Sequence, residues 1–228
     1  DALDGLRDQL IKVYQQQVEA FTDDGWLLRD QYIDLIFDRS EEGKEKFVKK
    51  YISKSLNEEE CIRLLKLLEM QYNALLMYTS CGWFFSDISG IETIQTLKYA
   101  ARAIQLAHDV TGVDLEEGFV KLLEQAVSNV PEYKNGAHIY KTLVKPSVVD
   151  LLRVGAHYAV SSLFEQYPSK LRMYCYTIKT EHYELKEAGR LRLALGYGWV
   201  NSNITGEKAH ICFTVLHLGD HNFIGGVD

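Results

Sequence analysis

Residues 79–92 interrupt an otherwise continuous helical pattern, and their sequence is Thr79-Ser80-Cys81-Gly82-Trp83-Phe84-Phe85-Ser86-Asp87-Ile88-Ser89-Gly90-Ile91-Glu92. Before them, apolar residues recur at the i, i+3, i+4, i+7 spacing of a helix face, and a similar spacing resumes after them. A plain link between two helices would be short and polar, whereas this one carries Trp83, Phe84 and Phe85 close to Asp87. The segment therefore either packs as a buried corner or lines a pocket.

Capping signals divide the first three quarters of the chain into helices. The pattern predicts helices over residues 2–21 and 27–37, and a third that Ser40 caps and that ends near Tyr51. Four further helix starts are expected where an Asn, Ser or Asp precedes an acidic residue by three positions, at Asn57/Glu60, Ser89/Glu92, Asp114/Glu117 and Ser147/Asp150. Gly112 is expected to end the helix that follows Ser89, and the last helix spans residues 148–165.

After Pro168 the pattern changes to that of strands. Residues 190–195 and 208–218 alternate with period two, and residues 171–183 are rich in Tyr, Thr and Ile. The predicted fold class is α+β, with a helical bundle domain over residues 1–168 and a small antiparallel sheet of three strands over residues 169–228. So small a sheet needs a cover, which either the helices or further strands beyond residue 228 could supply. The second case would make the segment part of a β-sandwich that continues beyond residue 228, since both ends of the chain resemble cuts inside a longer protein.

The composition of the chain argues against two classes of partner, nucleic acids and membranes. The chain has 228 residues, of which 46% are hydrophobic and 25% charged, and its net charge is -7 without a basic stripe, which argues against nucleic-acid binding. No apolar run approaches the ~20 residues that a membrane span needs, so no membrane partner is expected. Four cysteines without a Cys-x-x-Cys pair are typical of reduced thiols, which indicates a cytoplasmic protein.

The aromatic segment is one candidate site. Trp83 and Phe84 could stack on the apolar face of a sugar ring while the Asp87 carboxylate accepts hydrogen bonds from its hydroxyl groups. The alternative is that the rings fill a helix corner and that Asp87 forms a local turn.

A second candidate is the strand end that contains His217, Asp220 and His221, three residue types that ligate zinc. Its alternative is a polar strand end with a Gly-Asp turn. The chain has no nucleophile elbow, phosphate-binding glycine loop or zinc-protease motif, so no catalytic residue and no cofactor are predicted.

Three stretches of sequence carry a resemblance to a known family, and they are residues 68–93, 99–107 and 216–222. Over nearly its whole length the chain resembles a domain of unknown function found C-terminal to the catalytic barrel in glycoside hydrolase family 57-like proteins. The resemblance implies that the barrel, absent from this chain, holds the catalytic carboxylates and acts on alpha-glucans or related sugars.

Related family 57 enzymes are implied to have a helical domain after the barrel, with a Ser-Asp-Trp-like segment that reaches the active cleft. Ser80, Gly82 and Trp83 correspond to that segment, with Gly82 in place of the acidic residue. We therefore expect a non-catalytic region, inactive alone, that packs on the N-terminal barrel and helps to form a carbohydrate-binding cleft. The alternatives are a purely structural or oligomerisation domain and a metal-dependent hydrolase that uses the histidine cluster.

Overall fold

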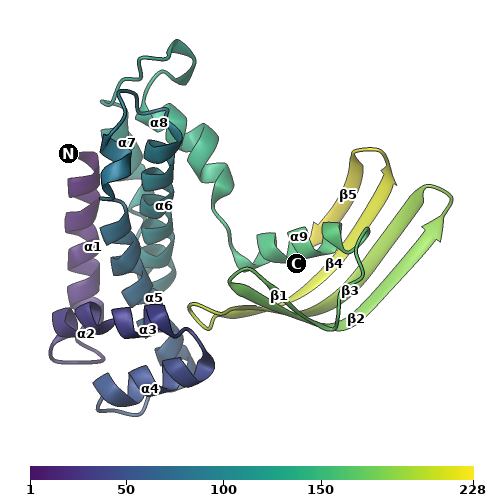
Figure 1. Ribbon diagram of the computed structural model, residues 1–228, viewed down its shortest axis with the longest axis horizontal. Coiled ribbons are helices and arrows are strands. Elements are labelled where there is room, and N and C mark those ends of the chain that lie inside the picture. Colours follow the sequence, from purple (N-terminus) through teal and green to yellow (C-terminus); the bar gives the residue numbers. More distant parts are fainter. The chain divides into compact units, whose positions relative to one another are not determined.

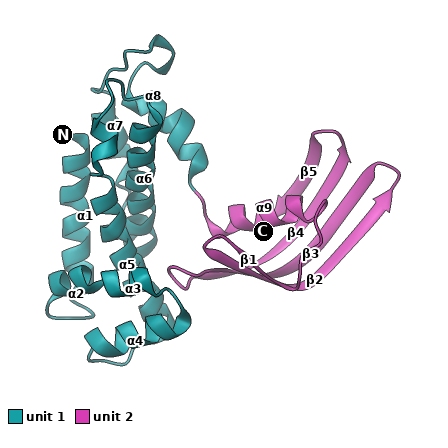
Figure 2. Ribbon diagram, viewed as in Figure 1, with its two compact units in different colours: residues 1–148 teal, residues 149–228 magenta.

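The computed structural model describes residues 1–228, which form two compact units, residues 1–148 and residues 149–228 (Figures 1 and 2). The first unit is helical, and the second packs one helix on an antiparallel sheet. The predicted α+β class is therefore confirmed.

The helical unit contains eight α-helices joined by short turns. They are α1 (Ala2–Val18), α2 (Gly25–Gln31), α3 (Ile33–Phe37), α4 (Glu41–Tyr51), α5 (Glu58–Leu76), α6 (Ile91–Thr111), α7 (Glu116–Leu123) and α8 (Gly136–Ile139). A 3-10 turn, η1 (Ser80–Trp83), lies between α5 and α6, and η2 (Pro131–Tyr133) precedes α8. A π-helical turn, η3 (Tyr140–Val144), and the 3-10 turn η4 (Lys145–Ser147) end the unit.

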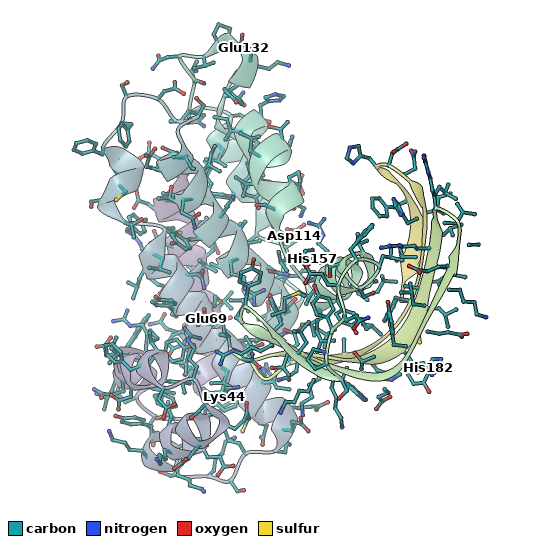
Figure 3. The ribbon with its side chains drawn as sticks, turned by 45° about the vertical axis from the view of Figure 1, so that its right-hand side comes forward. Lys44, Glu69, Asp114, Glu132, His157 and His182 are labelled. Atoms are coloured by element: carbon teal, nitrogen blue, oxygen red, sulfur yellow. The ribbon has the colours of Figure 1, made fainter.

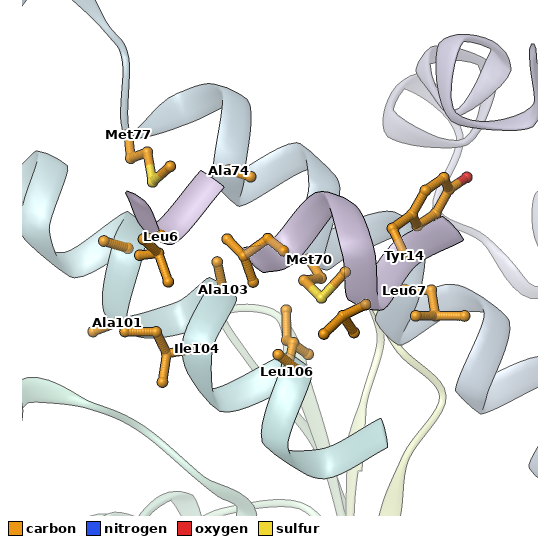
Figure 4. Close-up of a cluster of buried hydrophobic side chains, with 14 of the residues drawn as sticks. Leu6, Tyr14, Leu67, Met70, Ala74, Met77, Ala101, Ala103, Ile104 and Leu106 are labelled. Atoms are coloured by element: carbon orange, nitrogen blue, oxygen red, sulfur yellow. The ribbon is translucent and has the colours of Figure 1, made fainter. Parts of the chain in front are cut away.

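The core of this unit lies between α1, α5 and α6, whose apolar residues recur once per helical turn (Figure 4). Leu10, Leu67 and Leu106, one from each of these helices, are fully buried. Small residues such as Ala100 and Ala103 on α6 let the helix backbones approach closely. The periodicity on either side of the aromatic segment therefore marks the two longest core helices.

Two of the predicted caps form as expected. Ser40 accepts a hydrogen bond from the Gly43 N–H at 3.0 Å, and Asn57 and Glu60 form a reciprocal capping box with bonds of 2.9 and 3.0 Å. Gly112 ends α6 in the left-handed region at φ 72°, which only a residue without a side chain adopts freely.

Three predicted helix starts are wrong, because other residues cap or precede these helices. The N-cap of α6 is Gly90 rather than Ser89, and the Ser89 N–H donates to Asp87 instead. Asp114 accepts from the Glu116 N–H, two residues ahead, without capping α7. The last helix, α9 (Leu151–Ser161), is capped by Asp150 and not by Ser147.

The sheet of the second unit has five strands in the order β1-β2-β3-β4-β5, all antiparallel. They are β1 (Lys170–Met173), β2 (Tyr176–Ala188), β3 (Leu191–Ser202), β4 (Lys208–Gly219) and β5 (Asn222–Val227). Three strands were expected. A turn at Tyr174, whose φ is 54°, splits the run at residues 171–183 into two strands, and the glycine-rich stretch after the β4 turn forms β5.

The boundary between the units lies at Val148 and Val149, twenty residues before the expected one at 168. The reason is that α9 packs on the sheet, where its Val154 and Tyr158 join one core with strand residues such as Ile211. A Cβ on Gly155 would lie 2.3 Å from Ile211 Cδ1, so the glycine permits this close contact between helix and strand.

Candidate functional site

The aromatic segment, residues 79–92, presents its rings to solvent within the helical unit. Trp83, Phe84 and Phe85 are 62%, 80% and 56% exposed, and the two phenylalanine rings meet edge to face with centroids 5.1 Å apart. Side chains of this kind normally lie inside a protein, so contiguous exposed ones indicate a contact surface. The three rings therefore do not fill a buried corner of this unit.

Gly82 holds the start of the segment against α6. A Cβ at this position would lie 2.4 Å from Thr96 Cγ2, and the Gly82 carbonyl accepts a hydrogen bond from Thr93 Oγ1 at 3.1 Å. The position therefore has no space for a side chain in this arrangement. This contact gives a physical reason for a glycine at position 82.

Asp87 anchors the other end of the segment to a loop that is distant in the sequence. Its Oδ2 accepts a hydrogen bond from the Asn129 N–H at 2.6 Å, and its Oδ1 accepts from Ser128 Oγ at 3.0 Å and from the Ser89 N–H at 2.7 Å. The Asn129 side chain completes the junction by donating to the Ser86 carbonyl at 3.0 Å. Both carboxylate oxygens thus hold the segment in place.

These contacts favour the charged form of Asp87. Hydrogen bonds from the Ser89 side chain and N–H, and then from the Asn129 N–H, lower the pKa of the carboxyl from 3.8 to about 2. A depressed carboxyl pKa stabilises the folded state above the unfolded-state pKa, and this contribution is lost as the pH falls towards the folded-state pKa.

We expect Asp87→Asn to destabilise the protein at pH 6 and to have much less effect near pH 2, because the lowered pKa of about 2 places the loss of this contribution between about pH 4 and pH 2. Denaturant unfolding of both proteins at the two pH values measures the difference. Asp23→Asn, at an exposed position before α2, is the control. An equal Asp87→Asn effect at both pH values would contradict the proposed anchoring by the charged carboxylate.

The histidine cluster at the end of β4 has a different arrangement from that of a metal site. The His217 ring is buried, stacks on Phe223 with centroids 4.8 Å apart and meets Phe164 edge to face. Its Nε2 lies 3.1 Å from the backbone oxygen of Asp220, and the Asp220 and His221 side chains are exposed in the turn. Nowhere in residues 1–228 does a group of three or more His, Cys, Asp or Glu residues converge in a way that could hold a metal ion.

Sequence reasoning identified the aromatic segment but missed the loop that supports it. Ser128 and Asn129 contact Asp87 across 41 and 42 residues of sequence. Val127, which precedes them, and Ile91, which begins α6, are each 76% exposed. No local pattern connects Ser128 and Asn129 with Asp87, because their contact depends on how the chain returns along the bundle through α7.

Together these features define an α+β protein in which a helical bundle carries an anchored, exposed aromatic segment and a separate unit carries a meander sheet under one helix. The chain belongs to the family described as domain of unknown function DUF3536, whose family model matches residues 1–228. No curated protein and no solved structure matches it. None of its helices combines the length and the apolar character that a membrane crossing requires.

Proposed function

We propose that this region is a non-catalytic part of a glycoside hydrolase family 57-like protein, where its helical unit packs on the N-terminal catalytic barrel and completes a carbohydrate-binding cleft. The observation that carries the proposal is the exposure of the Trp83 ring on a segment that is fixed at both ends. A ring kept for packing in its own core would be covered by neighbouring side chains, whereas a ring that stacks on a sugar must present a face.

The anchoring of the segment supports the same proposal. Immobilising a mobile loop on binding costs conformational entropy, and a segment held in advance avoids that cost. In this proposal Trp83 stacks on the apolar face of a sugar ring, Phe84 adds a second apolar wall, and Asp87 keeps both residues in position through its contacts with residues 128–129.

Catalysis is assigned to the barrel and not to this chain, and no cofactor is assigned. The proposed substrates are alpha-glucans or related sugars, on the basis of the resemblance. All four cysteines, Cys61, Cys81, Cys175 and Cys212, are free thiols, which fits a cytoplasmic protein.

The test is Trp83→Ala in the protein that carries both this region and the barrel. Aromatic stacking on nucleic-acid bases contributes ~1–3 kcal/mol per ring, and we use it as an analogue for a sugar face. On this basis we expect a fall in kcat/KM of about 5- to 150-fold, with little change in melting temperature. Phe37→Ala is the matched control, since Phe37 is 84% exposed at the end of α3, outside the aromatic segment.

A purely structural role of the aromatic segment predicts that Trp83→Ala affects the association with the barrel more than it affects kcat/KM. If Trp83→Ala weakened the association of this region with the barrel and left the kinetics of the intact complex unchanged, the aromatic segment would be a docking surface only. Unchanged kinetics together with unchanged association would overturn both roles.

A further inference from the structure

The sheet of the second unit has two faces of different character. One face packs on α9 through apolar residues such as Ile178, Ala194 and Val215. No element of residues 149–228 covers the other face. His182 lies on this face (Figure 3). We call this second face the outer face.

The strand registers place the outer-face side chains in rows that cross the sheet. The rows are Lys179–Trp199–His210, then His182–Tyr197–Cys212–Asp228, then Glu184–Leu195–Thr214–Gly226, and last Lys186–Leu193–Leu216–Ile224. Aromatic and polar side chains therefore gather at one end of the outer face, and aliphatic ones gather at the other.

The aromatic end is a connected cluster of rings. Tyr197 stacks on His182 with centroids 5.6 Å apart and an interplanar angle of 24°, and Trp199 meets His210 at 4.9 Å. His210 Nε2 also lies 3.1 Å from a carboxylate oxygen of Glu181. Tyr197 and Trp199 stay 42% and 40% exposed, so these contacts hold the rings without covering them.

An open groove of about 540 Å³ runs beside this cluster and is lined by residues of β2, β3, β4 and β5. Its outer-face lining includes Tyr197, Thr214, Asp228 and Gly226. Gly226 contributes no side chain, and a Cβ built on it meets nothing within 4 Å, so the groove stays open at the β5 end.

We propose that the outer face, with Tyr197 in the lining of this groove and Trp199 in the neighbouring row beside it, is a binding site for a neutral oligosaccharide, separate from the aromatic segment of the helical unit. Two residues of a strand separated by one position lie ~7 Å apart, and we take this spacing to suit consecutive sugar units of a chain. The rings suit the C–H faces of sugars, and Thr214 together with Asp228 and His182 can exchange hydrogen bonds with hydroxyl groups.

The charges around the groove favour a neutral ligand. Lys179, Glu181 and Asp228 are of mixed sign, and acidic and basic residues are equally frequent in residues 149–228. A phosphate-rich polymer would need a basic surface instead. The aliphatic row at the other end of the sheet is not part of this site.

The experiment titrates the full chain with maltoheptaose, cellohexaose and chitohexaose, and follows the backbone amide signals of β3 and β4 by NMR. We expect one of the three to shift the signals of Tyr197, Trp199 and Thr214. Trp199→Ala and Tyr197→Ala should each raise the Kd by about 5- to 150-fold, the range for the loss of one stacking ring, and Trp199→Phe should restore part of the affinity.

Gly226→Val provides an independent test, because its side chain would occupy space in the groove without replacing the Tyr197 or the Trp199 ring. It should weaken binding without lowering the unfolding midpoint, and Leu191→Ala, on the same sheet outside the groove, should leave the Kd unchanged. The proposal is overturned if none of the three sugars binds, or if the ring variants and Gly226→Val leave the Kd unchanged. It is also overturned if a second copy of the chain protects the outer face in solution.

The variants Trp83→Ala and Trp199→Ala distinguish this site from the function proposed for the aromatic segment. Loss of sugar binding with Trp83→Ala alone would support the aromatic segment and reject the groove. Loss of sugar binding with Trp199→Ala alone would support the groove. The role of Trp83 would then be decided by the kinetics of the protein that also contains the barrel.

Discussion

Replacing Glu69 by Ala should lower the free energy of unfolding by about 3–5 kcal/mol, the range for removing one partner of a buried ion pair. Glu69 is 7% exposed on α5, where its Oε2 accepts a hydrogen bond from Tyr32 Oη at 2.6 Å and lies 3.3 Å from both terminal nitrogens of Arg39. Burial, and then the charge of Glu69, raise the pKa of Tyr32, so its hydroxyl stays a donor. The variant leaves this hydroxyl and the Arg39 charge without their acceptor.

Chemical denaturation measures the effect, and Glu45→Ala is the matched control. Glu45 forms an exposed i, i+4 ion pair with Lys49 on α4, and such pairs contribute ~0.3–0.5 kcal/mol. Glu69→Leu in an Arg39→Leu background should recover much of the loss, because an apolar pair leaves no buried charge. Similar losses for Glu69→Ala and Glu45→Ala would show that the buried network contributes nothing beyond a surface pair.

Gly198→Ala should destabilise the second unit by ~1–3 kcal/mol or more, because overpacking at this position is resisted by backbone atoms. A Cβ on Gly198 would lie 2.3 Å from the Lys179 carbonyl oxygen and 2.9 Å from Thr180 Cα, next to the irregular register between Thr180 and His182. Neither atom can move without shifting β2 against β3.

The matched control is the same substitution on the edge strand. Gly226→Ala meets nothing within 4 Å, so we expect no loss and a gain of ~0.4–1 kcal/mol from the less flexible unfolded chain. Denaturant unfolding followed by tryptophan fluorescence is suitable, since Trp199 lies on the same strand as Gly198. Equal effects of the two substitutions would contradict the close approach of β2 to Gly198.

The helical half of the fold was largely predictable from the sequence. Apolar residues such as Leu64, Leu68 and Leu97 follow helical spacing, and they are buried as that spacing requires. The caps at Ser40 and Asn57 form because each needs only a partner three residues away. At Ser89 the same pattern was misleading, because the nearby Asp87 carboxylate accepts the backbone hydrogen bond of Ser89.

The sheet was predicted only in part. The alternation in β3 and β4 identified both strands, since each buries every second residue under α9. β5 was not predicted, because Gly225 and Gly226 give it little alternation, and its pairing with β4 depends on the turn at Gly219 and Asp220. The position of α9 was also missed, because a helix's own sequence does not state which neighbour it packs against.

The sequence by itself determined the elements whose cause is local: the core helices, the caps within one turn, the two central strands and the presence of an aromatic segment at residues 79–92. Only the tertiary structure decided that Trp83 is exposed and that Asp87 bonds to residues 128–129. It also decided that Tyr197 and Trp199 share one face with His182 and His210. The physical reason is range: propensity and capping act over about four residues, whereas burial and these hydrogen bonds join residues that are tens of positions apart and depend on the packing of the whole unit.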